Sequence, residues 1–222
     1  MNFTIRLTTV ISLLFLCFAC SKDELSTINE SEVRLNYDEE FLFSVGNASN
    51  VEWSSSDEFV GVIEQDGKFS AKHIGETDIT AKVGQHIVTA KVIVDPYITD
   101  IIVPVLKFGV HSETIKSEET RAFISEDASQ IRFYGQGSRE SRVYYNLRRG
   151  VVDNSVMHFD YSQSIFNILL IFLGERYELL EVTPARLTYV NKEKTIGVNV
   201  TGSSSSGIRA TWVPSSYTVP KS

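Results

Sequence analysis

Residues 77 to 83, TDITAKV, alternate between two kinds of side chain at every position. The Thr, Ile, Ala and Val side chains fall on one face of an extended chain, and the Asp, Thr and Lys side chains fall on the other. Because successive side chains of a β-strand point to opposite faces, this alternation predicts a strand with one buried face. Several short segments of this kind, separated by turn residues, lie between residues 25 and 97. They predict a small β-sandwich of about seven strands, with Trp53 in its core.

The segment VEWSSSDEFVGVIEQDGKFSAKHIGETDITAKVG, residues 51 to 84, resembles the group 2 bacterial immunoglobulin-like (Ig-like) domain. The resemblance covers about residues 28–95 and rests on the joint occurrence of Trp53-Ser54-Ser55, Asp66-Gly67, Gly75 and Ile79-Thr80-Ala81. It implies an Ig-like sandwich that needs no inter-sheet disulfide. It also implies a part in adhesion, surface display or spacing, with no chemistry of its own.

The amino terminus has the pattern of an export signal. Residues 7 to 19 form an apolar run of signal-peptide length, which is too short to span a bilayer. Ala19 followed by Cys20 resembles the cleavage point of bacterial lipoprotein signal peptides, although Cys17 and Phe18 stand where that family usually has Leu and a small residue. A buried amino-terminal helix is the competing interpretation.

The lipoprotein resemblance implies that residues 1–19 are removed, that Cys20 carries the lipid, and that residues 20–27 form a tether. Two or three acyl chains on one cysteine would give a stable anchor, because a single chain binds a membrane only marginally. The sequence Lys22-Asp23-Glu24 resembles the export signal that sends such lipoproteins to the outer face of the outer membrane. We therefore expect an outer-membrane protein, held by its lipid and facing the exterior.

Residues 98–222 predict a second domain of the α+β class, an antiparallel sheet with one buried helix. The run SQSIFNILLIFLGERYELL, residues 162 to 180, has apolar side chains at helical spacing, and residues 111 to 120 suit a short polar helix. Three strand-like segments follow each predicted helix, an order that hints at a duplication. This half vaguely resembles α+β domains of surface lipoproteins whose activity is unassigned.

The charge is uneven along the chain. Positions 20 to 97 carry six Lys and Arg against 15 Asp and Glu, whereas positions 98 to 222 carry 14 against 13. Arg148 and Arg149 precede Gly150 between two apolar segments, which predicts a solvated hairpin tip. An acidic first half and the lack of a dense basic stripe argue against nucleic acid as a partner.

We find no motif for catalysis, a cofactor or a metal ion, and we expect the protein not to be an enzyme. Four aromatic residues are candidates for stacking on a ligand, with core packing as the alternative for each: Tyr134, Tyr144, Tyr145 and Trp212. Tyr144 and Tyr145 are adjacent in a predicted strand, so at most one of them can join an exposed surface.

These expectations together indicate a surface-tethered binding protein in which the Ig-like domain displays a second domain that binds a glycan or a surface or host protein. An adhesion or assembly component that binds through the Ig-like domain itself is the alternative. A polysaccharide-acting hydrolase in the second half is a third interpretation.

Overall fold

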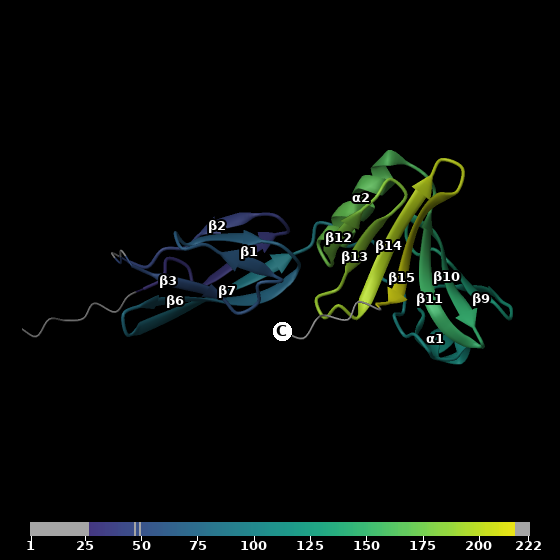
Figure 1. Ribbon diagram of the computed structural model, residues 1–222, viewed down its shortest axis with the longest axis horizontal. Coiled ribbons are helices and arrows are strands. Elements are labelled where there is room, and N and C mark those ends of the chain that lie inside the picture. Colours follow the sequence, from purple (N-terminus) through teal and green to yellow (C-terminus); the bar gives the residue numbers. More distant parts are fainter. Residues whose placement is uncertain (1–26, 47, 49, 216–222) are drawn as a thin grey trace, which may run out of the picture.

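The computed structural model describes residues 27–46, 48 and 50–215 of the chain (Figure 1). It is rich in β-structure, with two helices and three sheets among the described residues. Buried apolar side chains form two separate clusters, one within residues 33–94 and one within residues 101–212.

The first part is a sandwich of two sheets. One sheet has the strand order β1-β7-β6-β3, with β1 (Glu32–Asn36), β7 (His86–Asp95), β6 (Gly75–Val83) and β3 (Glu52–Ser55). The other has the order β2-β5-β4, with β2 (Glu40–Leu42), β5 (Lys68–Ala71) and β4 (Gly61–Ile63). Strand β1 runs parallel to β7, and the other pairs are antiparallel.

The alternation in β6 has the predicted consequence: Thr77, Ile79 and Ala81 are buried between the sheets. Trp53 is also buried, and its ring lies 6.2 Å from that of Phe43. Gly67 follows Asp66 in the β4–β5 turn with φ of 88°, and a Cβ at this position would lie 2.3 Å from the Phe43 carbonyl oxygen. The turn therefore requires glycine for both its conformation and its space.

The second part is one eight-stranded sheet with the strand order β12-β13-β14-β15-β11-β10-β9-β8, every pair of which is antiparallel. The strands are β8 (Phe123–Glu126), β9 (Gln130–Tyr134), β10 (Glu140–Arg148), β11 (Val151–Phe159), β12 (Glu178–Val182), β13 (Leu187–Val190), β14 (Ile196–Ser203) and β15 (Gly207–Pro214).

Each helix precedes a meander of four strands, and this differs from the predicted three. Helix α1 (Ser112–Glu118) comes before β8–β11, and α2 (Gln163–Gly174) comes before β12–β15. The unpredicted strands are β8 and β12, the two edges of the sheet. Helix α2 ends at Gly174, and the last residues of the run quoted from the sequence belong to β12, which covers residues 178 to 182.

Helix α2 begins after a capping residue, Ser162, whose side chain accepts a hydrogen bond from the Ile165 backbone N–H. Its residues Leu169, Phe172 and Leu173 are buried in the second cluster, against side chains from the sheet. Ile115 of α1 belongs to the same cluster, as do apolar residues of the segment between β7 and α1. The helices and this segment thus bury one face of the sheet.

Glu175, directly after α2, joins the two parts. Its buried carboxylate accepts hydrogen bonds from the backbone N–H of Tyr97 (2.5 Å) and Ile98 (3.2 Å) and from the Arg176 guanidinium (2.6 Å). Its backbone oxygen accepts from the Ile74 N–H of the first part. These bonds hold the connection between the two parts against the end of α2.

Candidate functional site

The face of the eight-stranded sheet opposite the helices, here called the open face, carries a groove of about 570 Å³. Every residue that lines it belongs to β9, β10, β11 or β15, and nearly all are polar or charged. They are Gln130, Arg132, Arg142, Tyr144, Asn146, Asn154, Val156, His158, Arg209 and Thr211. Because side chains alternate along each strand, these residues are set by the same pattern that buries their neighbours in the core.

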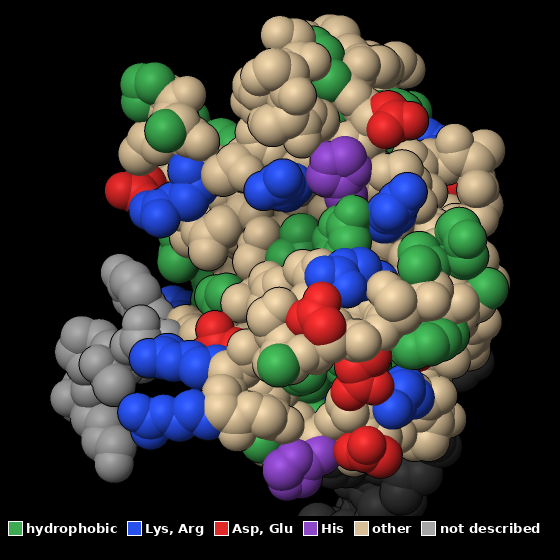
Figure 2. Space-filling view, turned by 90° about the vertical axis from the view of Figure 1, so that its right-hand side faces the viewer, with side chains coloured by type: hydrophobic (Ala, Val, Ile, Leu, Met, Phe, Trp, Pro, Cys, Tyr) green, Lys and Arg blue, Asp and Glu red, His purple; other side chains and the backbone are tan. Residues whose placement is uncertain are grey.

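Strand register arranges these side chains in rows across the sheet. Arg142 of β10 is paired with Tyr134 on one side and with His158 on the other, and His158 is paired with Arg209 of β15. Neighbouring strands are about 4.8 Å apart, so the two arginines stand about 10 Å from each other on either side of His158. Figure 2 shows Lys or Arg and His side chains around a group of hydrophobic side chains on this side of the molecule.

The next row continues the groove with Arg132, Tyr144, Val156 and Thr211 in register. Val156 is mostly buried, and it forms an apolar part of the floor. Tyr144 is half-buried and lines the groove beside it. A ligand in the groove would therefore meet aromatic and apolar surface between the charged groups.

Amide side chains form the third row. Gln130 donates a hydrogen bond to Asn146 (2.8 Å), Asn146 donates to Asn154 (2.6 Å), and Asn154 donates to Asp153 (3.2 Å). This chain of bonds fixes the orientation of the amides. Each of these amides can make further hydrogen bonds to a ligand, since it has two donor hydrogens and two acceptor lone pairs.

Only one of the three groove arginines forms an ion pair within the described part of the chain. Arg132 contacts Asp127 at 2.7 Å, and hydrogen bonds from Ser129, together with Arg132, lower the pKa of Asp127 below its ordinary range. Arg142 and Arg209 are exposed, and no acid pairs with either among residues 27–46, 48 and 50–215.

His158 is held in place within its row. One ring nitrogen lies 2.9 Å from the Ser141 hydroxyl, and the other lies 3.1 Å from the Ser206 carbonyl oxygen. Both ring nitrogens are therefore occupied by protein partners. The His158 ring therefore has a fixed orientation between the two arginines. The exposed guanidinium groups of Arg142 and Arg209 are the charged groups that a ligand can reach in this row.

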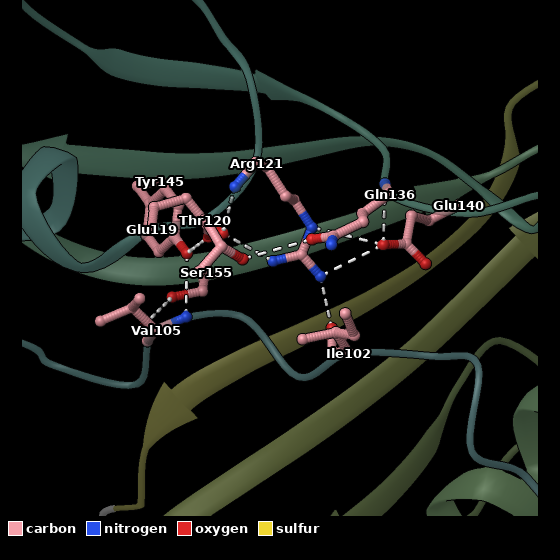
Figure 3. Close-up of polar contacts among 9 residues, drawn as sticks. All are labelled: Ile102, Val105, Glu119, Thr120, Arg121, Gln136, Glu140, Tyr145 and Ser155. Carbon is pink, nitrogen blue, oxygen red and sulfur yellow. Dashed lines mark hydrogen bonds and ion pairs between the residues drawn. The ribbon is translucent and has the colours of Figure 1, made fainter.

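A buried polar network supports β10 from the core side (Figure 3). Arg121 donates to the Glu119 carboxylate at 2.9 Å, to the Glu140 carboxylate at 3.2 and 3.3 Å, and to the Ile102 carbonyl oxygen. The Tyr145 hydroxyl donates to Glu119 and accepts from the Val105 N–H. Burial raises the pKa of Tyr145, and the Glu119 carboxylate raises it further, so this phenol stays protonated and donates.

The structure separates the four aromatic candidates into two pairs. Tyr144 lines the groove, and Tyr134 is exposed on the same face. Tyr145 and Trp212 are fully buried in the second cluster, so neither offers a surface for stacking, and the expectation is corrected for both. Trp212 instead donates a hydrogen bond to the Tyr177 hydroxyl at 3.0 Å.

The remaining site predictions concern Cys20, Lys22, Asp23 and Glu24, which lie outside the described residues. In the described part of the chain, no helix is long and apolar enough to cross a membrane. The same residues contain no group of three His, Cys, Asp or Glu side chains suited to a metal ion.

Sequence reasoning missed the groove. It considered Arg148 and Arg149, and the structure places them where β10 ends and the β10–β11 turn begins, as predicted for a hairpin tip. The sequence does contain one indication of the groove, because polar side chains occupy every second position in residues 130 to 134 and 142 to 146. This pattern shows which side chains of one strand share a face, but it does not show which strands are neighbours in the sheet.

Comparison with known proteins identifies one part of the chain. Residues 29–94 match the model of the bacterial Ig-like domain (group 2) family, which confirms the expected resemblance there. No curated protein matches the chain. One similar solved structure is that of domains 5-6 of the S-layer protein SbsC. It is 13% identical, covers 89% of this chain and 86% of that chain, and has a TM-score of 0.28, a value too low to support a conclusion.

Proposed function

We propose that the protein is a non-enzymatic binding protein of the cell surface, in which the Ig-like domain displays the second part and the open face binds a glycan or a protein. The observation that carries the proposal is the groove of the open face. It is lined by fixed amides, by two arginines that have no acid partner among the described residues, and by the exposed part of Tyr144. Concave sites with a few oriented polar groups are where proteins usually hold ligands.

The lining also supports a binding role over a catalytic one. None of the ten lining residues is a carboxylic acid, a serine or a cysteine. Most enzymes that cleave glycosidic bonds use two carboxyl groups on either side of the bond. A groove with this composition can hold a saccharide but lacks the groups that such enzymes use to cleave it.

The amino-terminal sequence and the Ig-like domain support the proposed location. In the proposal, Cys20 carries a lipid that anchors the mature protein in the outer membrane, and the Lys22-Asp23-Glu24 sequence directs it to the exterior. Mass spectrometry of the native amino-terminal peptide tests this part. An uncleaved Met1 or an unmodified Cys20 would refute the anchoring.

The binding role is tested by filling the groove. In Thr211→Trp, a bulky side chain would replace a half-buried residue in the middle of the open face. The matched control is Thr89→Trp, which makes the same change at an exposed position of β7 in the Ig-like domain. Binding of the full-length chain to a glycan array and to surface and host proteins is then compared for the two variants.

The expected result is loss of the bound ligand with Thr211→Trp and retention with Thr89→Trp. The reverse result would favour the second candidate, in which the Ig-like domain itself makes the contact. Turnover of a labelled polysaccharide by the unmodified protein would refute the non-enzymatic assignment.

A further inference from the structure

We infer that the ligand of the open face is an acidic glycan, whose carboxylate or sulfate groups lie between Arg142 and Arg209. This inference rests on the proposed function, and it goes further by naming the chemical class of the ligand. The argument comes from charge, from the arrangement of the rows, and from the kind of hydrogen bonds that the groove offers.

The first step is the charge of the groove. The chain as a whole carries a formal charge of −7, so positive side chains gathered in one groove are not a result of composition. The lining contains Arg132, Arg142 and Arg209 and no carboxylate. Two acids that do not line the groove contact residues that do. Asp127 forms an ion pair with Arg132, and Asp153 accepts a hydrogen bond from Asn154. The positive charge of the other two arginines is left for a ligand.

The second step is the spacing. Arg142 and Arg209 flank His158 in one row of the sheet, about 10 Å apart at the backbone. Their side chains are long enough to converge on one anionic group or to hold two anionic groups on successive sugar rings. A guanidinium can bind a carboxylate or a sulfate through two parallel hydrogen bonds, which fixes orientation as well as position.

The third step is the hydrogen bonding beside the arginines. Gln130, Asn146 and Asn154 present oriented amides, and Thr211 adds a hydroxyl. Such groups match the hydroxyls of a saccharide, which both donate and accept hydrogen bonds. Tyr144 supplies an aromatic surface between the amide row and the row of arginines.

The groove suits a saccharide better than an acidic peptide. Its floor is the face of a sheet, so the backbone groups of the central strands are already paired within the sheet. An extended peptide would find side-chain partners there but no strand edge with which to pair its backbone. A saccharide has no backbone amides to satisfy.

The test uses the mature full-length chain and measures affinity by isothermal titration calorimetry. The probes are oligogalacturonate for carboxylate groups, dextran sulfate for sulfate groups, and neutral dextran of similar length. Polyglutamate and duplex DNA are included as anions of other classes. The variant is Arg142→Gln with Arg209→Gln, which removes two charges and keeps amide donors at both positions.

The matched control is Arg148→Gln with Arg149→Gln. Arg148, the last residue of β10, and Arg149, in the turn that follows, are exposed and do not line the groove. The control therefore removes the same charge from the chain. Any binding that depends only on net charge falls equally in both double variants. Near- and far-ultraviolet circular dichroism shows that both remain folded.

We expect at least one acidic glycan to bind, neutral dextran not to bind, and the Arg142→Gln/Arg209→Gln variant to lose affinity by at least about tenfold, because charge-assisted hydrogen bonds are lost. The control should stay within about twofold. The preferred anionic probe tells whether carboxylate or sulfate is recognised.

Equal loss in both double variants, binding of neutral dextran that survives the arginine changes, or tighter binding of polyglutamate or DNA would each overturn the inference. A ligand of another kind that Thr211→Trp displaces would leave the proposed function standing while refuting the acidic glycan. If Thr211→Trp displaces no ligand at all, the proposed function fails as well.

Discussion

The first prediction concerns the buried network around Arg121 and its contribution to the stability of the second part of the fold. The Arg121 side chain is 1% exposed, and the carboxylates of Glu119 and Glu140 are 2% and 0% exposed. One guanidinium therefore serves two buried acids, and the Glu140 Oε2 atom has no hydrogen-bond partner among the described residues. Removing Arg121 would leave both acids without a compensating charge.

We expect Arg121→Met to lower the free energy of unfolding of this part by about 3 to 5 kcal/mol, the cost typical of removing one partner from a buried ion pair. For a chain of this size each kcal/mol shifts Tm by about 2 to 4 °C, so the fall in Tm is about 6 to 20 °C. Met fills much of the same volume, so the loss comes mainly from charge and hydrogen bonding. Glu140→Gln should cost less, because it keeps an acceptor oxygen and removes one of the two negative charges.

The two tryptophans allow each core to be followed separately, since Trp53 lies in the first cluster and Trp212 in the second. In a Trp53→Phe background, fluorescence during urea denaturation reports on the core that contains Trp212. The stability change is obtained from the shift in midpoint at constant m-value. The control is Lys107→Met, which breaks the exposed pair with Glu118 and should cost less than about 1 kcal/mol. A loss below about 1 kcal/mol for Arg121→Met would refute the reasoning.

Three further predictions concern other buried or joining contacts. Tyr177→Phe should cost about 1 to 3 kcal/mol in urea denaturation, because it removes the acceptor of the buried Trp212 N–H. Gly67→Ala should cost more than about 1 kcal/mol by differential scanning calorimetry, because the turn has positive φ and no room for a Cβ. For Asp57, burial alone would raise the pKa, but the hydrogen bond and charge of Lys192 and backbone N–H groups hold it below its ordinary value. The stability that this pair contributes is therefore present above the unfolded pKa of about 3.9 and is lost as pH falls through the lower folded pKa.

Each of these has a control. Tyr161→Phe changes an exposed tyrosine and should stay within about 0.5 kcal/mol. Gly84→Ala also has positive φ, but no atom lies within 4 Å of the added Cβ, so its loss should be smaller than that of Gly67→Ala. Asp57→Asn should lower Tm at pH 6 and match the unmodified chain near pH 2. A difference that persists at low pH would mean that ionisation of Asp57 is not the cause.

The first part of the fold was predictable because its signals are local. The alternation of residues 77 to 83, the Asp66-Gly67 turn and the buried Trp53 follow from the sequence pattern. Helix α2 was predictable for a similar reason, since its apolar spacing and its Ser162 cap lie within one short segment.

The edge strands β8 and β12 could not be predicted in this way. All five side chains of β12 are exposed, so the segment has no alternation, and it is a strand only because β13 pairs with it. The open face escaped prediction because its groove combines four strands, of which β15 lies beside β11 only through a long-range pairing. The burial of Arg121, Glu140 and Glu175 likewise depends on contacts between distant segments, which residue type alone does not reveal.

The parallel pairing of β1 with β7 sets the mechanical behaviour of the Ig-like domain. The register runs from Glu32 opposite Lys91 to Asn36 opposite Asp95, so the chain enters β1 at the end of the pair that is opposite to the end where it leaves β7. A pull on the two ends of the domain would slide the two strands along each other. The hydrogen bonds between the two strands would then bear the load together. In a hairpin pulled apart at its open end, by contrast, the hydrogen bonds break one after another. A domain connected in this way resists stretching along the line that joins its two ends.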